Sequence, residues 1–569
     1  MPAAPKILHE MKNNIFTAHP VATALAFSAI CLLPTMLMRD FSPSNELRYL
    51  SIADEALRDG HIFAFTNHGA AYADKPPLYI WIIMLCKLIA GRHSMFLLSL
   101  FSLLPAFVIT WTTDRWTAFK DPGKRAGSAL MLMSSVLFLG VSVFLRMDML
   151  MAMFIVLALH TFYLMYKGEG DYRKQRILLP VWIFLALFTK GPIGLLMPPV
   201  TILCFLLLRG RIREAGRYLG WRTWVIIASL SAAWFLGVYL DGGVEYIENL
   251  LFKQTFGRAV NSFHHSEPFW YYLVCIWYVI APYCLAAVGS LAVSAATLLR
   301  KKGISGTGAT AVSCGSAAGV SDVEALFTVA VASTIIMLSC FSGKLSIYIL
   351  PVIPFIIYLF PVVEERTGWK KWMGICLVVP AAILTAAGIA IAGAVIFKPA
   401  FIMEPAADYQ FAFTPLTAVA GLTLAAGCGI GIYSILRRQK WVKGVFYIAT
   451  GLLLTVYCGS LLMPGINDFA GYGNICSYVQ DEGEVVTLCV HRPENIDVYI
   501  GREVNDYGYE IDRFIEERIE NYNGEPYTLL TRAGKLSDYP QILDLINANN
   551  AIQVGELTRI HVTSIPEKQ

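Results

Sequence analysis

Residues 373–397 read MGICLVVPAAILTAAGIAIAGAVIF, a run of 25 residues without a charged side chain. A helix needs about 20 apolar residues to cross the hydrocarbon core of a bilayer, so this stretch predicts a membrane-spanning helix. The composition agrees, because 56% of the 569 residues are hydrophobic and only 15% are charged. An average soluble domain is about 25% charged. These values exclude a soluble enzyme, a disordered chain and a disulfide-rich scaffold.

Runs of this kind recur along most of the chain and predict a polytopic α-helical membrane protein with about thirteen transmembrane helices. A further run, from Leu78 to Ala90, has thirteen residues, contains Lys87 and follows Pro76-Pro77. Its length leaves open whether it crosses the membrane or lies at the interface. The thirteen predicted spans are 17–37, 95–113, 127–145, 147–166, 177–189, 192–208, 223–240, 270–297, 325–341, 347–363, 373–397, 414–436 and 444–463.

The distribution of basic residues decides the topology, although the net charge is only +4 and does not indicate nucleic-acid binding. If 78–90 does not cross, six basic loops all fall on the cytoplasmic side, as the positive-inside rule requires. If it does cross, all six lie outside. We therefore predict a cytoplasmic N-terminus and thirteen spans. The six loops contain residues 115–125, 167–176, 209–222, 300–302, 370–371 and 437–443.

Two segments on the predicted outer side, 45–58 and 244–257, place apolar residues at helical spacing and charges on the other faces. They predict amphipathic helices at the membrane surface. The same side receives isolated ionisable residues at the ends of spans, and such residues are costly at membrane depth. Each alone is typical of a snorkelling side chain or a helix cap. Together they indicate one shared site, formed by Asp74, Lys75, Asp148, Lys190, Lys344 and Tyr348.

Several of these groups are donors suited to phosphate oxygens. Arg258 follows the second amphipathic segment and adds another cation, whereas Glu46 and Asp148 add carboxylates. Cations with carboxylates at a lipid-facing site suggest chemistry on a phosphate-bearing lipid. The nearby pair His264-His265 is consistent with either a metal site or ordinary hydrogen bonding. Composition and topology go no further than this.

Six pieces of the chain form a recognisable series. In order they are NELRYLSIADEALRDG (45–60), YADKPPLYIW (72–81), RMDMLMAMFIVLAL (146–159), LFTKGPIGLLMPP (187–199), FGRAVNSFHHSEPFWYY (256–272) and SGKLSIYILPVIP (342–354). This series resembles the bacterial aminoarabinose (4-amino-4-deoxy-L-arabinose) lipid A transferases and their relatives in the protein mannosyltransferase (PMT) superfamily of GT-C glycosyltransferases. The resemblance implies a GT-C fold and an inverting glycosyltransferase. It also implies a donor sugar on a polyprenyl phosphate such as undecaprenyl phosphate, and an acceptor that is lipid A, another glycan or a protein.

The resemblance also implies roles for individual residues and a place in the cell. Lys75, Arg258 and Tyr348 match the positions that contact the donor phosphate, and Lys190 belongs to the same site. Asp148 matches a catalytic acidic residue. The location implied is the bacterial inner membrane, with the active site on the periplasmic face. No cofactor is implied as required, although a divalent metal is associated with the positions of Asp74 and His265.

One position departs from the family pattern, which usually reads Asp-Glu where this chain has Asn45-Glu46. The Asp is the usual choice for a general base, and Asn cannot accept a proton. With a hydroxyl acceptor, Glu46 or Asp148 must take that role. With a phosphate acceptor no base is needed, so the departure fits lipid A modification; altered or lost activity is the alternative.

From residue 465 the composition becomes strongly charged, which predicts two domains: a transmembrane domain, 1–464, and a small periplasmic α/β domain, 465–569. We expect strands at 485–490, 527–531 and 552–565 and helices at 510–522 and 539–550. Cys476 and Cys489 are equally consistent with a disulfide and with two free thiols.

Three other functions share parts of this pattern. A protein O-glycosyltransferase of the same superfamily differs only in its acceptor. A transporter or flippase for a lipid-linked sugar shares the apolar spans and the cationic site, but usually has internal repeats and access from both faces. A non-catalytic lipid-binding protein is the third alternative, because Asn45 stands where the family usually has Asp.

Overall fold

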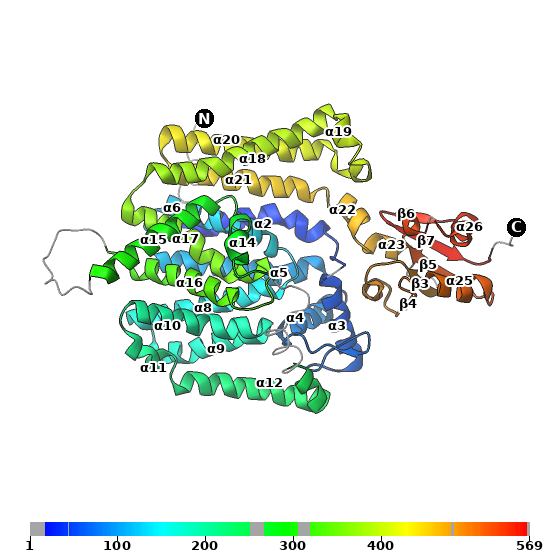
Figure 1. Ribbon diagram of the computed structural model, residues 1–569, viewed down its shortest axis with the longest axis horizontal. Coiled ribbons are helices and arrows are strands. Elements are labelled where there is room, and N and C mark those ends of the chain that lie inside the picture. Colours follow the sequence, from blue (N-terminus) through cyan, green and yellow to red (C-terminus); the bar gives the residue numbers. More distant parts are fainter. Residues whose placement is uncertain are drawn as a thin grey trace, which may run out of the picture.

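The computed structural model describes residues 18–43, 45–250, 267–304, 319–479, 483–536 and 538–565. A bundle of long helices leads, at its carboxyl-terminal end, into a small sheet (Figure 1). Within the described residues, nine helical stretches are long and apolar enough to cross a membrane. They are α2 (Pro20–Met38), α5 (Met95–Thr117), α8 (Met147–Lys167), α12 (Trp221–Glu248), α16 (Asp322–Ser339), η3 with α17 (Ser346–Val352 and Ile353–Thr367), α18 (Lys371–Phe397), α20 (Pro415–Arg438) and α21 (Trp441–Ser460).

The other four predicted spans are also helical, but they are shorter, more charged or broken. Helix α10 (Pro192–Leu208) has 17 residues, and α9 (Tyr172–Lys190) carries basic residues at both ends. The remaining two predicted spans are each interrupted. The pairs are α6 (Pro122–Met133) with α7 (Val136–Val141), and α14 (Tyr271–Val279) with α15 (Cys284–Ile304). The all-helical membrane fold is thus confirmed, and all thirteen predicted ranges contain helices, two of them divided into two helices each.

The two interruptions face each other and satisfy each other's polar groups. The Ser134 hydroxyl lies 2.8 Å from the Tyr283 hydroxyl, and the Val136 N–H donates to the Ala281 carbonyl at 3.0 Å. A helix break in an apolar environment leaves backbone groups that must find partners inside the protein. Because each break supplies partners to the other, both persist within otherwise apolar runs.

Helix α4 (Leu78–Ala90) is the short run on which the topology depends. Its thirteen residues span about 20 Å, less than the roughly 30 Å of a bilayer core. It packs against the amphipathic helix α3 (Glu46–Asp59) beside one end of the bundle (Figure 1). Lys87 at its end pairs with Asp54 of α3 at 2.6 Å. These features favour a helix that stays at the membrane surface.

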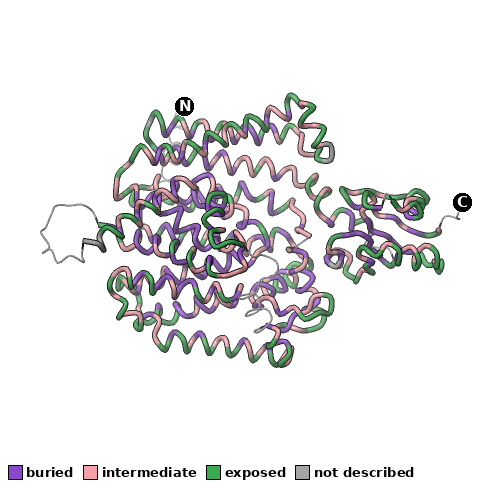
Figure 2. The backbone as a smooth tube through the Cα atoms, in the orientation of Figure 1, coloured by how far each residue is buried: buried purple, intermediate pink, exposed green. Residues whose placement is uncertain are grey.

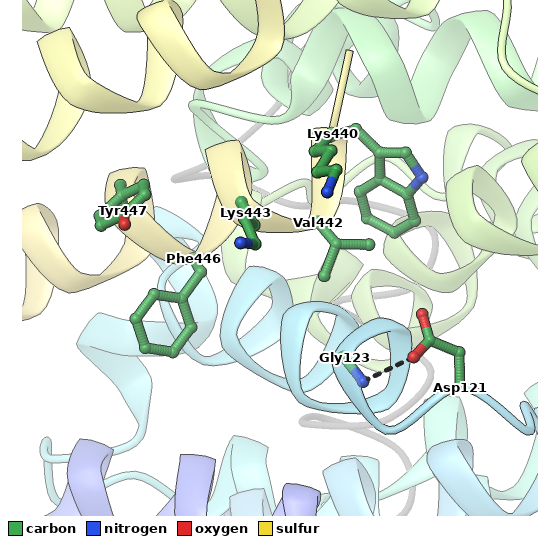
Figure 3. Close-up of a pocket in the computed structure, with 8 residues that line it drawn as sticks. Asp121, Gly123, Lys440, Val442, Lys443, Phe446 and Tyr447 are labelled. Carbon is green, nitrogen blue, oxygen red and sulfur yellow. Dashed lines mark hydrogen bonds between the residues drawn. The ribbon is translucent and has the colours of Figure 1, made fainter. Parts of the chain in front are cut away.

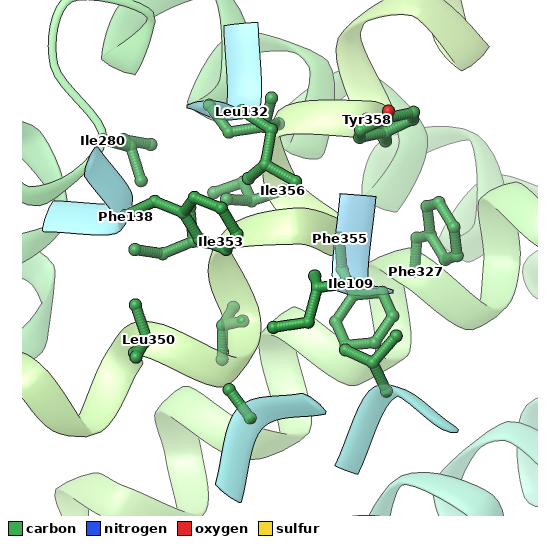
Figure 4. Packing of buried hydrophobic residues seen from close by; sticks show 14 of the residues in the cluster. Ile109, Leu132, Phe138, Ile280, Phe327, Leu350, Ile353, Phe355, Ile356 and Tyr358 are labelled. Carbon is green, nitrogen blue, oxygen red and sulfur yellow. The ribbon is translucent and has the colours of Figure 1, made fainter. Parts of the chain in front are cut away.

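The centre of the bundle is filled by α17 and the helices around it. Ile353 and Phe355 of α17 are completely buried against Ile109 of α5 and Leu132 of α6 (Figure 4). By contrast, α18, α20 and α21 lie along one side of the bundle and are largely exposed (Figures 1 and 2). The apolar outer faces of these three helices are expected to contact lipid.

Glycines bring these three outer helices into close contact. A Cβ atom on Gly388 of α18 would lie 2.5 Å from the Gly421 carbonyl oxygen of α20, and one on Gly427 of α20 would lie 2.5 Å from Gly451 Cα of α21. No side chain fits at these crossings. Small residues at helix crossings are the usual means of association in a bilayer, where apolar surface alone gives no driving force.

The carboxyl-terminal region forms a five-stranded sheet in the order β4-β3-β5-β7-β6. Strand β3 is parallel to β4 and β5, whereas β7 is antiparallel to β5 and β6. The predicted single strand at 552–565 is two strands, because Gly555 turns the chain at positive φ. Cys476 and Cys489 are both free and buried. The strands are β3 (Glu484–Leu488), β4 (Asn505–Asp506), β5 (Tyr527–Thr531), β6 (Ile552–Val554) and β7 (Leu557–Val562).

Short helices complete the carboxyl-terminal region and the loops of the bundle. The predicted helices at 510–522 and 539–550 correspond to α25 with η6 and to α26. The short elements are β1 (Thr66–Asn67), β2 (Ala70–Ala71), η1 (Ile212–Glu214), α11 (Ala215–Tyr218), α19 (Ala400–Met403), η4 (Ala407–Ala412), α22 (Met463–Ala470), α23 (Gly473–Ser477), η5 (Pro493–Ile496), α24 (Asp497–Ile500), α25 (Ile511–Ile515), η6 (Glu516–Glu520), η7 (Ala533–Lys535) and α26 (Pro540–Ala548).

The carboxyl-terminal region is held to the bundle by the loop between α2 and α3. The Asp40 carboxylate accepts hydrogen bonds from the Tyr499 hydroxyl and, at 2.8 Å, from the Gly473 N–H. The Asn495 side chain donates to the Pro43 carbonyl at 2.6 Å. This loop leads directly into α3, so the small domain braces the start of the amphipathic helix.

Candidate functional site

Five segments far apart in the sequence meet at the end of the bundle that carries α3. They are the start of α3, the segment before α4, the first turn of α8, the last turn of α9 and η3. The Leu145 N–H, just before α8, donates to the Glu46 carboxylate at 2.8 Å and fixes the start of α8 beside that of α3. We call the polar residues gathered here the charged cluster: Asp74, Lys75, Arg146, Asp148, Lys190 and Tyr348.

An ion pair between Asp148 and Lys190 forms the centre of the charged cluster. The Asp148 side chain is 5% exposed and that of Lys190 is 11% exposed, so the pair is nearly removed from solvent. The Lys190 ammonium lies 4.7 Å from the centroid of the Tyr348 ring, a cation–π distance. The predicted association of these three residues is therefore present.

Asp74 and Lys75 lie in the segment that leads into α4, and Pro76-Pro77 follow them. The Lys75 ammonium lies 3.4 Å from the Asp74 carboxylate, which also lies 3.4 Å from the Tyr72 hydroxyl. Lys75 is close enough to Lys190 for the two positive charges to repel each other. The two prolines fix the backbone before α4 and so hold this charged pair at the bundle end.

Three residues of the site had no role in the sequence interpretation. They are Arg48, Tyr49 and Arg146. The Arg48 guanidinium lies 5.6 Å from the centroid of the Tyr49 ring and 5.9 Å from that of Tyr72. The Arg146 guanidinium is close enough to Tyr49 and Lys190 to interact electrostatically with both. Burial raises the pKa of the Tyr49 phenol, which therefore remains a hydrogen-bond donor. The signal available was the order Arg48-Tyr49 inside the quoted α3 motif, and Arg146 beside Asp148.

Glu46 is buried beside this cluster but is differently bonded. Its side chain is 3% exposed and accepts two hydrogen bonds from the Arg39 guanidinium, at 2.7 and 2.8 Å. It also accepts the Ser42 N–H at 2.7 Å, besides the Leu145 N–H. Four donors occupy the two oxygens. This geometry connects α2, the start of α3 and the start of α8.

Asn45 precedes α3 and makes no capping hydrogen bond with its side chain. Its side-chain oxygen lies 3.4 Å from the Arg48 guanidinium. An Asp at this position would therefore face a cation directly.

Other predicted residues lie apart from the cluster or outside the described ranges. Arg258 and His265 fall in 251–266 and are outside the described residues. Lys344 is 4% exposed and donates to the Glu267 carbonyl at 2.7 Å. Among the described residues, no three His, Cys, Asp or Glu side chains are grouped so as to hold a metal ion. The metal prediction at Asp74 and His265 therefore stays a prediction.

The electrostatics of the charged cluster favour an anion. Lys75, Arg146 and Lys190 supply three positive charges, whereas Asp74 and Asp148 supply two negative charges. Arg48 beside Tyr49 adds another cation nearby. Ammonium and guanidinium groups bind phosphate oxygens strongly when water is partly excluded. The geometry is suited to hold a phosphate at the end of a membrane-embedded bundle.

The described residues form a multi-pass helical bundle with surface helices and a small α/β region at one end, which is the GT-C fold expected from the sequence. It matches the crystal structure of ArnT from Cupriavidus metallidurans bound to undecaprenyl phosphate, with a TM-score of 0.71 at 16% identity. The match covers 96% of this chain and 99% of that one. The apo state of the same protein matches with a TM-score of 0.69. At this identity the likeness concerns the fold.

Sequence comparison confirms the resemblance predicted above. Residues 74–234 match the dolichyl-phosphate-mannose-protein mannosyltransferase family. The chain is 28% identical over 277 residues to an undecaprenyl phosphate-alpha-4-amino-4-deoxy-L-arabinose arabinosyl transferase of Pseudomonas fluorescens, covering 47% of each. A transferase of the same name from Shewanella sediminis is 25% identical over 278 residues, covering 46% of this chain and 49% of the relative. The chain thus spans about half the length of the curated relatives it matches.

Proposed function

We propose that this protein is an inverting glycosyltransferase that moves a sugar from a polyprenyl-phosphate carrier to a lipid A-type or other acceptor. The single observation that supports this most is the excess of cations around the Asp148–Lys190 pair. Relatives that carry the name aminoarabinose transferase make aminoarabinose, or a similar sugar, the first donor to test.

In this proposal the donor phosphate is bound by Lys75, Tyr348 and Arg258, with Lys190 in the same site. When the bond between the sugar C1 and the phosphate oxygen breaks, both bonding electrons stay with that oxygen. The leaving polyprenyl phosphate therefore gains negative charge. Cations already in place stabilise this charge in the transition state without reorganising, which is the usual source of a large rate gain.

The acceptor attacks C1 from the face opposite the leaving phosphate, and this inverts the configuration. We assign Asp148 to that face, where it orients Lys190 and interacts with a positively charged group such as the amine of an amino sugar. An acceptor phosphate is already an anion, so it forms the new C1–O bond without losing a proton. A hydroxyl acceptor needs a base, and Asp148 then becomes that base.

We assign Glu46 a positioning role. A carboxylate with four donors is a weak base, because each hydrogen bond stabilises its charged form. Asn45 offers no carboxylate at all. The absence of a free carboxylate at the start of α3 therefore favours a phosphate acceptor over a hydroxyl.

The charge-derived topology supports a multi-pass protein of the bacterial inner membrane whose charged cluster and carboxyl-terminal region, 465–569, face the periplasm. A reporter fused after residue 569 should then report a location outside the cytoplasm. A cytoplasmic carboxyl terminus would mean that 78–90 crosses and would reverse the sidedness.

The proposed metal is tested with a chelator, which should lower turnover only if a cation is bound at Asp74 and His265.

The function is tested with purified protein in lipid nanodiscs that contain undecaprenyl phosphate-linked aminoarabinose and lipid A. Mass spectrometry of the lipid A should show the added sugar, and undecaprenyl phosphate should accumulate in equal amount. The Lys75→Gln variant should make much less product. Movement of the donor between leaflets without any glycosylated product would support the transporter instead and overturn the proposal.

A further inference from the structure

The opposite end of the bundle carries a groove that the glycosyltransferase proposal does not use. It lies between the start of α6 and the start of α21 and has a volume of about 490 Å³ (Figure 3). Helix α21 has 20 residues, about 30 Å, and its other end leads to α22 and the sheet. The groove is therefore about one bilayer core away from the charged cluster.

The groove combines two lysines with aromatic and aliphatic side chains. Lys440 and Lys443 are exposed, and neither has an ion-pair partner among the described residues. Lys443, Phe446 and Tyr447 have the spacing that places side chains on one face of a helix, and Figure 3 shows Lys440, Lys443 and Phe446 on the α21 side. The lysines thus lie about one turn closer to the bundle end than the Phe446 and Tyr447 rings, and Trp441 of the lining lies beside them at the start of α21.

The α6 side of the groove contributes one glycine and one carboxylate to the lining. Gly123 lines it, and an added Cβ there would come within 3.4 Å of Val442. Asp121 is the acidic residue of the lining, but its carboxylate caps α6 by accepting the N–H groups of Gly123 and Lys124 at 3.0 and 3.3 Å. With two lysines and one carboxylate in its lining, the groove has a net positive charge.

We propose that this groove binds the headgroup of an anionic phospholipid. The phosphodiester would lie between Lys440 and Lys443, and the first carbons of an acyl chain would lie along Val442 and Phe446. Basic pockets beside membrane helices bind anionic headgroups in this way. Charge complementarity and the position at the end of an exposed spanning helix favour a membrane lipid over a soluble anion. The proposal does not depend on the enzymatic activity.

Native mass spectrometry of the full chain in detergent tests the inference, with dioleoyl phosphatidylglycerol or phosphatidylcholine added. Undecaprenyl phosphate is kept in excess to occupy the donor site. Wild type should retain phosphatidylglycerol more tightly than phosphatidylcholine. Because each lysine contributes a factor of about 5, Lys440→Gln/Lys443→Gln should weaken retention of phosphatidylglycerol roughly 10- to 30-fold and leave phosphatidylcholine unchanged.

The matched control is Lys370→Gln/Lys371→Gln, which removes two exposed lysines at the start of α18, outside the groove. This control should leave the retention of both lipids unchanged. An equal loss in the two double variants would show general surface charge and overturn the proposal, as would no loss in either. Displacement of phosphatidylglycerol by millimolar inorganic phosphate would identify a soluble anion as the ligand and would also overturn it.

Discussion

Two buried ion pairs at the same end of the bundle differ in how completely their charges are neutralised. In the Arg39–Glu46 pair, the carboxylate is 3% exposed and accepts four hydrogen bonds, two from the guanidinium and two from backbone N–H groups. In the Asp148–Lys190 pair, one ammonium is the carboxylate's ion-pair partner within the described residues, and Lys75 and Arg146 add further positive charge.

The difference separates a structural pair from a binding pair. A closed pair has no remaining capacity for a ligand, but removing one partner leaves a buried charge unpaired. An open pair with surplus cations is stabilised when an anion arrives. Both pairs consist of one buried carboxylate and one buried cation, so residue type alone does not distinguish them. The number and the origin of the hydrogen bonds do.

Breaking the closed pair should have the largest effect. Glu46→Gln leaves Arg39 buried without a counter-charge, so we expect the free energy of unfolding to fall by about 3–5 kcal/mol. Thermal unfolding in detergent measures this change. Asp59→Asn is the control, because Asp59 pairs with Arg58 on the exposed surface of α3 and such pairs contribute about 0–1 kcal/mol. An unchanged unfolding temperature with lost turnover would contradict this structural role and support a catalytic role for Glu46.

Breaking the open cluster should reduce activity and leave the fold intact. Losing one charge-assisted hydrogen bond costs about 1.5–3 kcal/mol, so Lys75→Gln or Arg258→Gln should lower kcat/KM roughly 10- to 100-fold. Turnover of a polyprenyl-phosphate sugar is the measurement, and Lys87→Gln is the control of equal charge change outside the cluster. Activity within twofold of wild type in both site variants would remove the donor-phosphate assignment.

Restoring the carboxylate before α3 should have a modest effect. If the acceptor is a phosphate, Asn45→Asp adds no useful base, and Arg48 at 3.4 Å from the present side-chain oxygen would pair with the new charge. We therefore expect turnover to stay within a few-fold of wild type from about pH 5 to 9. Base catalysis is worth typically 10²- to 10⁴-fold, so a large gain that develops as pH rises through a carboxylate pKa would indicate a hydroxyl acceptor.

The last prediction concerns the pH dependence of stability at the contact between the carboxyl-terminal region and α3. Burial raises the pKa of the Asp497 carboxyl to about 7, and Glu503 and Glu55 add to the shift. The folded state then binds a proton that the unfolded state releases near pH 4. Stability should fall as pH rises from about 4 to 7. Thermal unfolding at several pH values should show this fall in wild type and a smaller one in Asp497→Asn. An equal fall in the stability of both proteins would show that a group other than Asp497 titrates.

Hydrophobic pattern predicted the helical membrane fold, the amphipathic helix α3 and most of the terminal strands, because each depends on local sequence. It did not predict the breaks at Ser134 and Ala281, since both runs stay apolar while their backbone partners come from each other. The four hydrogen bonds to Glu46 could not be predicted either, because one donor is the N–H group of Leu145, 99 positions away. Asp148 and Lys190 could be predicted because they stand at the ends of predicted spans, and Asp74 and Lys75 because they precede the short run 78–90.

The central claim is that the open cluster, and not the closed pair, binds the donor phosphate. Equilibrium binding of undecaprenyl phosphate to the purified protein tests it directly, with Lys75→Gln/Tyr348→Phe compared against Arg39→Leu/Glu46→Leu. The second variant removes both charges of the closed pair but also leaves the Ser42 and Leu145 N–H groups without their acceptor, so thermal unfolding first verifies that it is folded. We predict that the first variant binds roughly 100-fold more weakly, the sum of one charge-assisted and one neutral hydrogen bond. The second should bind within about threefold of wild type, since it removes no hydrogen bond to the ligand. Unchanged binding by the first variant, or loss only in the second, would contradict the account.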